Sequence, residues 1–231
     1  MKTIGIVGGI APESTIHYYR LIISAYREHK QDGSYPSILI NSIDMKKMLD
    51  LIGANDLIGV SNYLVDETEK LARSGAAFGL LASNTPHIVF DHIQARASIP
   101  LISIVAATCA AAQSLGLKRV GLFGTAFTMK GRFYADVFSR AGISVVPPDP
   151  DEQGYIHHKY MNELVHGVFL PGTRDRLLEI ADRLREHAGI DGLVLGGTEL
   201  PLLLNDIGGG VIPFLDTTKI HAECAVARML S

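Results

Sequence analysis

The 231-residue sequence contains no tryptophan, only two cysteines and no strong excess of one charge. Its 21 basic and 24 acidic residues give a formal net charge of −3, which argues against nucleic acid or an anionic membrane surface as a partner. Cys109 and Cys224 are too few for a disulfide framework, so we predict a reducing, cytoplasmic location. Both lie in apolar, helix-like stretches, and we expect both thiols to be buried.

Long apolar runs are also missing. A membrane-spanning helix needs about 18 or more mostly apolar residues, and no run in the sequence approaches that length. The apolar run Ile4–Ile10 is followed at once by Pro12-Glu13-Ser14, which is typical of a first β-strand rather than of a signal peptide. We therefore predict a protein without a membrane partner.

The sequence does contain a strand-and-loop motif that occurs twice. Aligning Ser83 with Gly197 gives an offset of 114 residues between the two copies. Two further pairs agree, at offsets of 116 and 113 residues. The matched pairs are Gly79–Pro86 with Gly192–Glu199, Gly5–Gly9 with Gly121–Thr125, and Ile99–Ile102 with Ile212–Leu215. Because each match is short, chance similarity among strand ends is the alternative, but the consistent offset favours an internal duplication.

Short apolar runs bounded by glycine or proline alternate with helical segments along the whole chain, which is typical of buried parallel strands. The predicted strands are Thr3–Gly8, Ser37–Ser42, Phe78–Ala82, Pro100–Ile104, Arg119–Gly124, Ser144–Val146, Leu193–Leu195 and Val211–Leu215. We predict an α/β fold of two pseudo-symmetric lobes, each a four-stranded parallel sheet flanked by helices. The expected lobes are residues 1–99 with 213–231, and residues 100–212. Asn55 and Thr173 are the predicted caps of helices that stop at Gly75 and Gly189.

Ligands of such sheets bind at the carboxyl ends of the strands, so the loops there are the candidate site. After the first strand, the backbone of Gly9 and Ile10 and the hydroxyls of Ser14 and Thr15 form a candidate cradle for a carboxylate or phosphate. The alternative is a tight turn in which Ser14 caps a helix. The glycine spacing does not match a dinucleotide-binding fingerprint.

The loop Ser83-Asn84-Thr85-Pro86-x-His87 follows the third strand. It predicts either an oxyanion or carboxylate pocket with Ser83 at its floor, or helix capping alone. His87 lies one turn into the following helix and could reach that pocket, although a structural hydrogen bond is the commoner role. No Gly-x-Ser-x-Gly sequence surrounds Ser83, so a hydrolase triad is not predicted.

In the second half, Thr125 and Thr198-Glu199 occupy the corresponding strand ends. Thr198-Glu199 mirrors Asn84-Thr85, and Glu199 is either a catalytic acid or a residue that only complements a helix dipole. The adjacent histidines His157 and His158 have no partners at metal-ligand spacing, so no metal site is predicted.

These residues, in this order, resemble the aspartate/glutamate racemase superfamily, specifically its aspartate-racemase-like branch. The resemblance covers essentially the whole chain, and its motifs occur in both halves. They are Thr3–Gly9, Glu13-Ser14-Thr15, Ser83–His87, Gly124-Thr125-x-x-Thr128-Met129, Gly196–Glu199 and Pro213-x-x-Asp216-Thr217-x-x-Ile220-His221-Ala222. The resemblance implies an active site in the cleft between two lobes, a homodimer, and racemisation of acidic amino acids without pyridoxal phosphate or another cofactor.

The family chemistry implied by the resemblance uses two cysteines, one on each side of the substrate α-carbon. One thiolate removes the proton and the other thiol returns one to the opposite face. The matching positions here hold Ser83 and Gly197, so both thiols are missing. A serine hydroxyl is a weak base without an adjacent general base, and glycine has no side-chain proton to exchange.

Three hypotheses therefore stand for a protein that binds a small acidic amino acid or dicarboxylate. The first is a racemase with a rearranged acid/base pair, for instance Ser83 with His87 on one face and Glu199 or water in the space left by Gly197. The second is another enzyme of the superfamily, such as a lyase or a one-sided α-proton exchanger. The third is a catalytically silent sensor. We expect ligand contacts from Asn84, Thr85, Thr125 and Thr198, and from Gly9, Ile10, Ser14 and Thr15.

Overall fold

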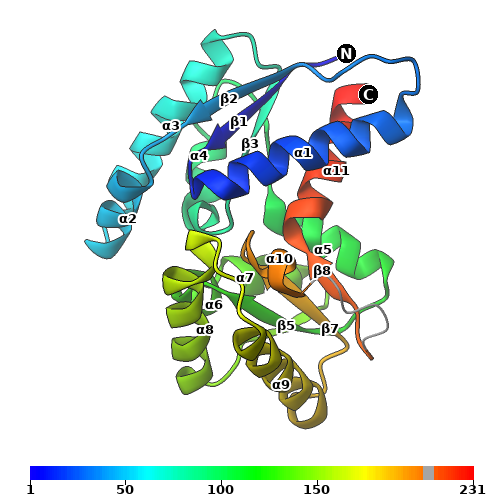
Figure 1. Cartoon of the computed structure of the whole chain (residues 1–231). Helices are drawn as coiled ribbons and strands as arrows, with labels where there is room; N and C mark the ends of the chain where they lie inside the picture. The colour runs from blue at the N-terminus through cyan, green and yellow to red at the C-terminus, as the bar shows by residue number, and fades with distance from the viewer. Residues whose placement is uncertain (205–210) are drawn as a thin grey trace. The chain divides into compact units, whose positions relative to one another are not determined.

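The computed structural model describes residues 1–204 and 211–231 and divides into two compact units. The first unit contains residues 1–104 and 218–231, and the second contains residues 105–217. The chain leaves the first unit after residue 104 and returns to it at residue 218, in the C-terminal helix drawn in red in Figure 1. No helix within the described residues is long and apolar enough to cross a membrane.

The first unit contains a four-stranded parallel sheet in the order β2-β1-β3-β4. Its elements are β1 (Ile4–Gly8), α1 (Pro12–His29), β2 (Ile38–Ser42), α2 (Met45–Gly53), α3 (Leu57–Arg73), β3 (Phe78–Leu81), the 3₁₀ helix η1 (Thr85–Val89), α4 (Phe90–Gln94) and β4 (Leu101–Ile102). α5 (Ile104–Ser114) leads into the second unit, and α11 (Thr217–Leu230) completes the first.

The second unit repeats this plan, with a parallel sheet in the order β6-β5-β7-β8. Its elements after α5 are β5 (Arg119–Gly124), α6 (Ala126–Lys130), α7 (Phe133–Arg140), β6 (Ser144–Val146), α8 (Pro150–Asn162), the 3₁₀ helix η2 (Leu164–His166), α9 (Pro171–Ala188), β7 (Gly192–Gly196), α10 (Leu200–Leu204) and β8 (Phe214–Asp216). Two parallel four-stranded sheets with the same strand order confirm the predicted fold class.

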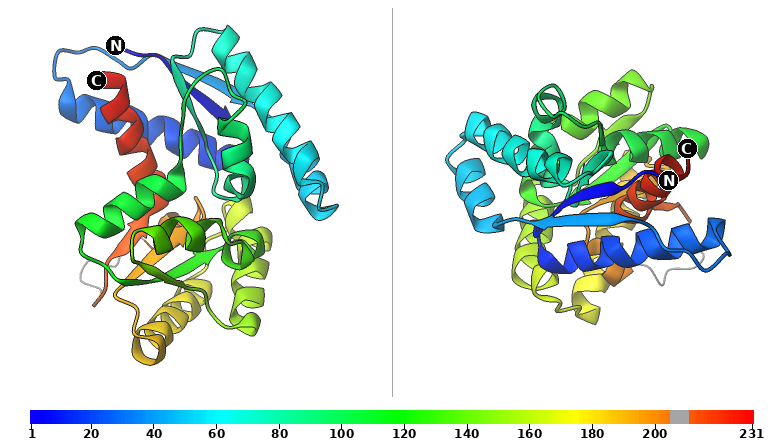
Figure 2. Two further views of the ribbon diagram at one scale, coloured as in Figure 1. Left: turned by 180° about the vertical axis from the view of Figure 1, so that it is seen from behind. Right: turned by 90° about the horizontal axis from the view of Figure 1, so that it is seen from above.

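In the first unit, apolar side chains of β1 and β3 pack against α1 and α11. Figure 2 shows β1 and β2 lying between α1 and α3, so helices cover both faces of this sheet. The buried core on the α1 side includes Tyr18, Ile22 and Val226. The two chain ends meet here, because the backbone N–H of Lys2 donates to the carbonyl of Met229 at 3.2 Å.

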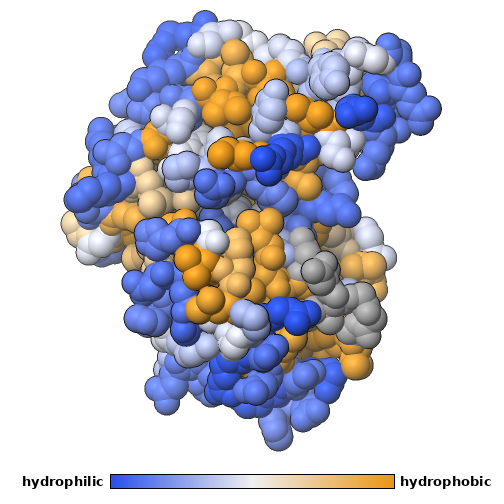
Figure 3. All heavy atoms as spheres, viewed as in Figure 1, coloured by the Kyte–Doolittle hydropathy of each residue, from blue (hydrophilic) through white to orange (hydrophobic). Residues whose placement is uncertain are grey.

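In the second unit, α8, α9 and α10 pack on β5 and β7 through a cluster that includes Phe123, Ile156 and Leu184. Leu177, Ile180, Ala181 and Leu184 recur at helical spacing, so α9 buries one stripe and exposes the other. Figure 3 shows the outward surface of α9 as hydrophilic. Gly189 ends the helix with φ of 65°, in the left-handed region that glycine enters most readily, as the sequence predicted.

Several details differ from the sequence predictions. The units divide a few residues later than predicted at both crossovers, because β4 pairs with β3 and β8 pairs with β7. Asp56, not Asn55, caps α3, since its carboxylate accepts the N–H of Gly59 at 2.8 Å. Thr173 does not cap α9; its hydroxyl donates to Glu163 at 2.6 Å.

The two cysteines also differ from each other. Cys109 is buried in α5, as predicted, and burial raises the pKa of its thiol. Cys224 is exposed on α11, so the prediction of a buried thiol was wrong for this residue. The apolar residues around Cys224 in the sequence indicated burial, but an amphipathic helix turns one position in that stretch outward.

Candidate functional site

The loop after β1 is held together by its own hydroxyl groups. Gly9 has φ of 83°, and a Cβ atom added there would lie 2.4 Å from the carbonyl oxygen of Ile43, so only glycine fits. The N–H of Gly9 donates to Oγ1 of Thr15 at 2.8 Å. The hydroxyl of Ser14 donates to the carbonyl of Ala82 at 2.9 Å and ties this loop to the end of β3.

Ser14 therefore does not cap α1, as one of the two sequence interpretations had it; it lies inside the helix, whose N-cap is Ala11. Hydrogen bonds within the protein hold this loop, and the N–H of Gly9 already donates to Thr15. A ligand contact from the backbone of Ile10, or from the hydroxyls of Ser14 and Thr15, would leave these hydrogen bonds in place.

The loop after β3 places Ser83, half-buried, ahead of the buried side chains of Asn84 and Thr85. His87 is 3% exposed and has both ring nitrogens in hydrogen bonds to the backbone. Nε2 accepts the N–H of Ile104 at 3.1 Å, so Nδ1 carries the proton and donates to the carbonyl of Ser83 at 3.0 Å. His87 thus fixes the backbone of Ser83.

A second buried histidine lies beside the first. The ring centroids of His87 and His221 are 6.3 Å apart in an edge-to-face arrangement. Burial, reinforced by the charge that His221 would carry, lowers the pKa of His87 to about 3. Burial also lowers the pKa of His221 to about 4. Both imidazoles are therefore neutral at physiological pH.

In the second unit, the loop after β5 begins at Thr125, which caps α6. Its Oγ1 accepts the N–H of Thr128 at 3.3 Å. The following N–H, of Ala126, donates to Nδ1 of His157 at 3.2 Å. His157 therefore supports this loop, and burial lowers the pKa of its imidazole.

Helix α8 carries His157 and, one turn further on, Tyr160. The helix begins where it does because Asp149 accepts the N–H of Glu152 at 3.0 Å and Pro150 occupies the first helical position. Residues three apart share a helix face, so His157 and Tyr160 face the same side of α8. Tyr160 belongs to the core cluster with Phe123 of β5 and Leu195 of β7, and His157 is half-buried.

The loop after β7 contains Gly197, Thr198 and Glu199, all buried. The Tyr160 hydroxyl donates a hydrogen bond to Oε2 of Glu199, and Oγ1 of Thr198 donates to the same oxygen at 2.8 Å. Burial, followed by the negative charge of Glu199, raises the pKa of Tyr160 well above its ordinary value of 10. Glu199 thus has two hydroxyl partners, which a role limited to the helix dipole would not require.

The strand register shows that Ser83 and Gly197 are equivalent positions. Leu81 pairs with Val7 in the first sheet, and Leu195 pairs with Phe123 in the second. Val7 and Phe123 belong to the matched segments at the 116-residue offset. Ser83 and Gly197 each lie two residues beyond the paired leucine. Ser83 therefore follows β3 and Gly197 follows β7, the corresponding strands of the two sheets. Neither has a thiol.

Sequence reasoning missed Tyr160, because no motif surrounds it and its partner Glu199 lies 39 residues away. One signal was available: a glycine at a position where a side chain is expected leaves a space that another large residue must fill. Among the described residues, no group of three or more histidines, cysteines or acids could hold a metal ion.

Comparisons with known proteins agree over nearly the full length. Residues 7–225 match the family model described as Asp/Glu/Hydantoin racemase. The broad specificity amino-acid racemase RacX of Bacillus subtilis is 26% identical over 235 residues, which cover 99% of this chain and 98% of that protein.

Two solved structures are similar over the full length of both chains. A candidate Asp/Glu racemase from Yersinia pestis is 31% identical, with a TM-score of 0.91. An aspartate racemase homologue from Pyrococcus horikoshii is 32% identical, with a TM-score of 0.86. Both likenesses extend across both units.

Proposed function

Because this chain belongs to the Asp/Glu/hydantoin racemase family, we propose that it is an isomerase-type enzyme that moves the α-proton of a small acidic amino acid or dicarboxylate. The reaction needs no pyridoxal phosphate and no metal in this proposal. The observation that carries it is the pair of equivalent polar loops after β3 and β7, each with buried hydrogen-bonding side chains at the carboxyl end of a parallel sheet.

The proposed binding groups are the polar side chains of these strand ends. Asn84 and Thr85 in one unit, and Thr125 in the other, offer amide and hydroxyl donors for carboxylate oxygens. The Thr198 hydroxyl donates to Glu199, so its part in ligand contact would be that of an acceptor. Gly9, Ile10, Ser14 and Thr15 are the proposed contacts from the adjoining loop. Hydrogen bonds from Gly9 to Thr15 and from Ser14 to Ala82 hold that loop in place. The interlobe cleft expected from the sequence stays a prediction, as do the homodimer and the cytoplasmic location.

The residues proposed for proton transfer divide into two groups. Ser83 faces the ligand in the first unit, and His87 positions it, since His87 holds the Ser83 carbonyl while both of its own nitrogens are engaged. In the second unit Gly197 offers no proton, and Glu199 is the nearest acid on the same loop.

The alternative function is a one-sided proton exchanger, a lyase or a silent ligand-binding protein. The specific observation behind it is that the two equivalent positions are chemically unlike, with a hydroxyl at Ser83 and no side chain at Gly197. A two-base racemase requires a proton carrier on each face of the α-carbon.

Incubation with each enantiomer of aspartate and glutamate in D₂O separates these functions. ¹H NMR reports loss of the α-proton, and chiral chromatography reports inversion. We expect exchange at the α-carbon; exchange with inversion supports racemisation, and exchange with retention supports the one-sided enzyme. Calorimetric binding of these acids without any exchange would contradict the proposed enzyme and support the silent binding protein.

A further inference from the structure

The ring of Tyr160 occupies the space in front of Gly197. A Cβ atom built on Gly197 would lie 2.4 Å from Cε2 of Tyr160 and 2.9 Å from its hydroxyl oxygen. Real Cβ atoms essentially never approach other atoms to under 3.0 Å, so no side chain fits at position 197 while Tyr160 keeps this position. The edge of the Tyr160 ring therefore occupies the space of a residue-197 side chain, and the phenol hydroxyl lies directly beside that space.

This place is the point of the second sheet at which a ligand is expected. In the strand order β6-β5-β7-β8, β6 is added on one side of β5, and β7 and β8 are added on the other side. Ligands of open α/β sheets bind at such a switch point, outside the carboxyl ends of the two strands. The loop after β7 begins at Gly197, beside the Tyr160 ring. The loop after β5 is bonded to the same helix, because the N–H of Ala126 donates to Nδ1 of His157.

The hydroxyl is also connected to an acid. Tyr160 is 6% exposed and Glu199 is 2% exposed, and the phenol donates its hydrogen bond to Oε2 of that carboxylate. A buried carboxylate held by two hydroxyl donors is a proton acceptor that burial keeps away from bulk water. Because the pKa of Tyr160 is raised, the phenol stays protonated and can pass a proton without itself becoming an anion.

We propose that Tyr160 and Glu199 form the proton relay of the second unit and replace the side chain that Gly197 lacks. Tyr160 is the catalytic residue, and Glu199 is the proton store behind it. The inference rests on the proposed function, because it assigns a group to the α-proton transfer of that reaction.

The step balances as a relay. The Cα–H bond of the ligand breaks and its electron pair stays on the α-carbon, while its proton forms a bond to Oη of Tyr160. The proton that Tyr160 carried moves to Oε2 of Glu199, so the phenol stays neutral and the carboxylate becomes a carboxylic acid. The same steps in reverse deliver a proton to the α-carbon.

The test compares Tyr160→Phe with Tyr134→Phe in the D₂O exchange assay. Tyr160→Phe keeps the ring packing and removes only the hydroxyl. Tyr134 is a matched control, since it is a fully buried tyrosine of the same unit with a hydroxyl hydrogen bond to Thr108. We expect Tyr160→Phe to lower the exchange rate by about 100-fold or more, the usual size of a general acid–base contribution, while Tyr134→Phe stays within about threefold.

A second pair of variants tests Glu199. Glu199→Gln keeps the size of the side chain and cannot store the proton, so we expect a loss similar to that of Tyr160→Phe and the disappearance of the acid limb of the pH–rate profile. Glu199→Asp should retain that limb. Because the two residues act as one relay, the double variant should lose little more than either single variant.

The outcomes separate this inference from the function on which it rests. Exchange by the wild type that persists within threefold in folded Tyr160→Phe would overturn the relay and leave the proposed function standing. A wild type that binds aspartate or glutamate by calorimetry but exchanges no α-proton would overturn both.

Discussion

The hydroxyl of Tyr18 lies 2.9 Å from Nδ1 of His221, a residue 203 positions further along the chain. On its other side, His221 Nε2 lies 2.9 Å from the carbonyl oxygen of Ile102. A carbonyl only accepts, so Nε2 carries the proton and Nδ1 accepts the Tyr18 hydroxyl. α1, β4 and α11 of the first unit therefore meet at an imidazole whose two nitrogens are both hydrogen-bonded and whose pKa burial lowers to about 4.

The first prediction concerns pH. In the unfolded chain His87 and His221 titrate near 6.5, and in the folded protein near 3 and 4. Between pH 6.5 and about 4 the unfolded state binds more protons, so the free energy of unfolding falls as the pH falls. Each histidine contributes a slope of about 1.4 kcal/mol per pH unit in this window. Urea unfolding of the wild type at pH 7, 6 and 5 measures this slope.

The variant His221→Gln isolates one of these terms. Glutamine places a donor near the Nε2 position but does not titrate, so the slope between pH 6.5 and 5 should decrease by about 1.4 kcal/mol per pH unit. His157 also has a lowered pKa, so His157→Gln is the control that measures its contribution to the pH dependence of the free energy of unfolding. An unchanged slope in His221→Gln would show that folding does not lower the pKa of this imidazole.

The second prediction concerns the thiols. Cys224 is exposed, whereas Cys109 is buried with a raised pKa, so iodoacetamide should modify only Cys224 in the native protein. Mass spectrometry of tryptic peptides reads the sites. Ligand binding and α-proton exchange should be unchanged, because the residues at the equivalent positions 83 and 197 are not cysteines. Rapid inactivation that an acidic ligand prevents, and that persists in Cys224→Ser, would place Cys109 at the ligand.

The third prediction concerns the space shared by Gly197 and Tyr160. Gly197→Cys puts a Cβ atom 2.4 Å from the Tyr160 ring and should cost about 1–3 kcal/mol of stability by overpacking. Combining it with Tyr160→Leu, which removes the clashing ring atoms, should recover part of that cost. Combining it with Tyr160→Phe should not, since the ring remains. A double-mutant cycle from urea unfolding gives the coupling free energy.

The same space decides whether two thiols can be restored. Ser83→Cys with Gly197→Cys supplies one thiol at each equivalent position, but the second collides with Tyr160. We therefore expect racemisation of aspartate or glutamate to appear, or increase, only in the triple variant that also carries Tyr160→Leu. A folded triple variant that binds these acids yet exchanges no α-proton would contradict the assignment of positions 83 and 197 to the α-carbon.

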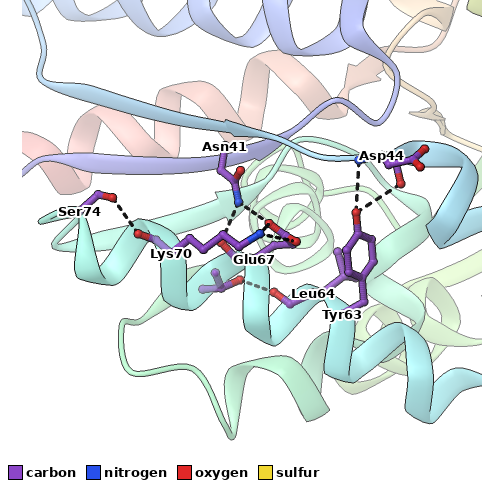
Figure 4. A network of polar contacts seen from close by, with 8 residues as sticks. Asn41, Asp44, Tyr63, Leu64, Glu67, Lys70 and Ser74 are labelled. Carbon is purple, nitrogen blue, oxygen red and sulfur yellow. Dashed lines mark hydrogen bonds and ion pairs between the residues drawn. The ribbon is translucent and has the colours of Figure 1, made fainter.

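The fourth prediction concerns the polar contacts between β2 and α3, shown in Figure 4. Nδ2 of Asn41 donates to the Glu67 carboxylate at 2.7 Å and to the Glu67 carbonyl at 3.0 Å. Burial alone would raise the pKa of Glu67, but hydrogen bonds from Lys70 and Asn41 hold it below its usual value. Asn41→Ala should lower the free energy of unfolding by about 1–3 kcal/mol, because a largely buried carboxylate loses a donor.

The control for Asn41→Ala is Ser74→Ala, at the end of the helix α3 that carries Glu67. Its exposed hydroxyl donates to the Lys70 carbonyl at 2.8 Å, and an exposed substitution of this kind should change stability by less than about 0.5 kcal/mol. Urea unfolding at pH 7 compares the two. Equal effects would mean that burial of Glu67 does not set the cost.

Local patterns predicted which segments form strands, but not all of their bounds. Pro100–Ile104 and Val211–Leu215 were predicted too long, since the strands are Leu101–Ile102 and Phe214–Asp216. Arg119–Gly124 and Ser144–Val146 have the predicted bounds, and Gly189 ends α9 as expected. Helix starts were less accurate, because Asp56 and Asn55 are equally good caps by residue type. Asn55 has φ of 56° and lies in the turn, so the path of the backbone, not the residue type, selected Asp56.

The sequence by itself determined the duplicated α/β plan, the strand ends that carry polar residues, and the absence of a thiol at positions 83 and 197. These are properties of apolar periodicity, turn residues and the identity of single positions, all of which are local. Tertiary structure alone decided what surrounds those positions. It placed the Tyr160 ring in the space of the missing Gly197 side chain, and it engaged both nitrogens of His87 with the backbone. Such contacts join residues that are distant along the chain, and only close packing of the folded core fixes which atoms meet.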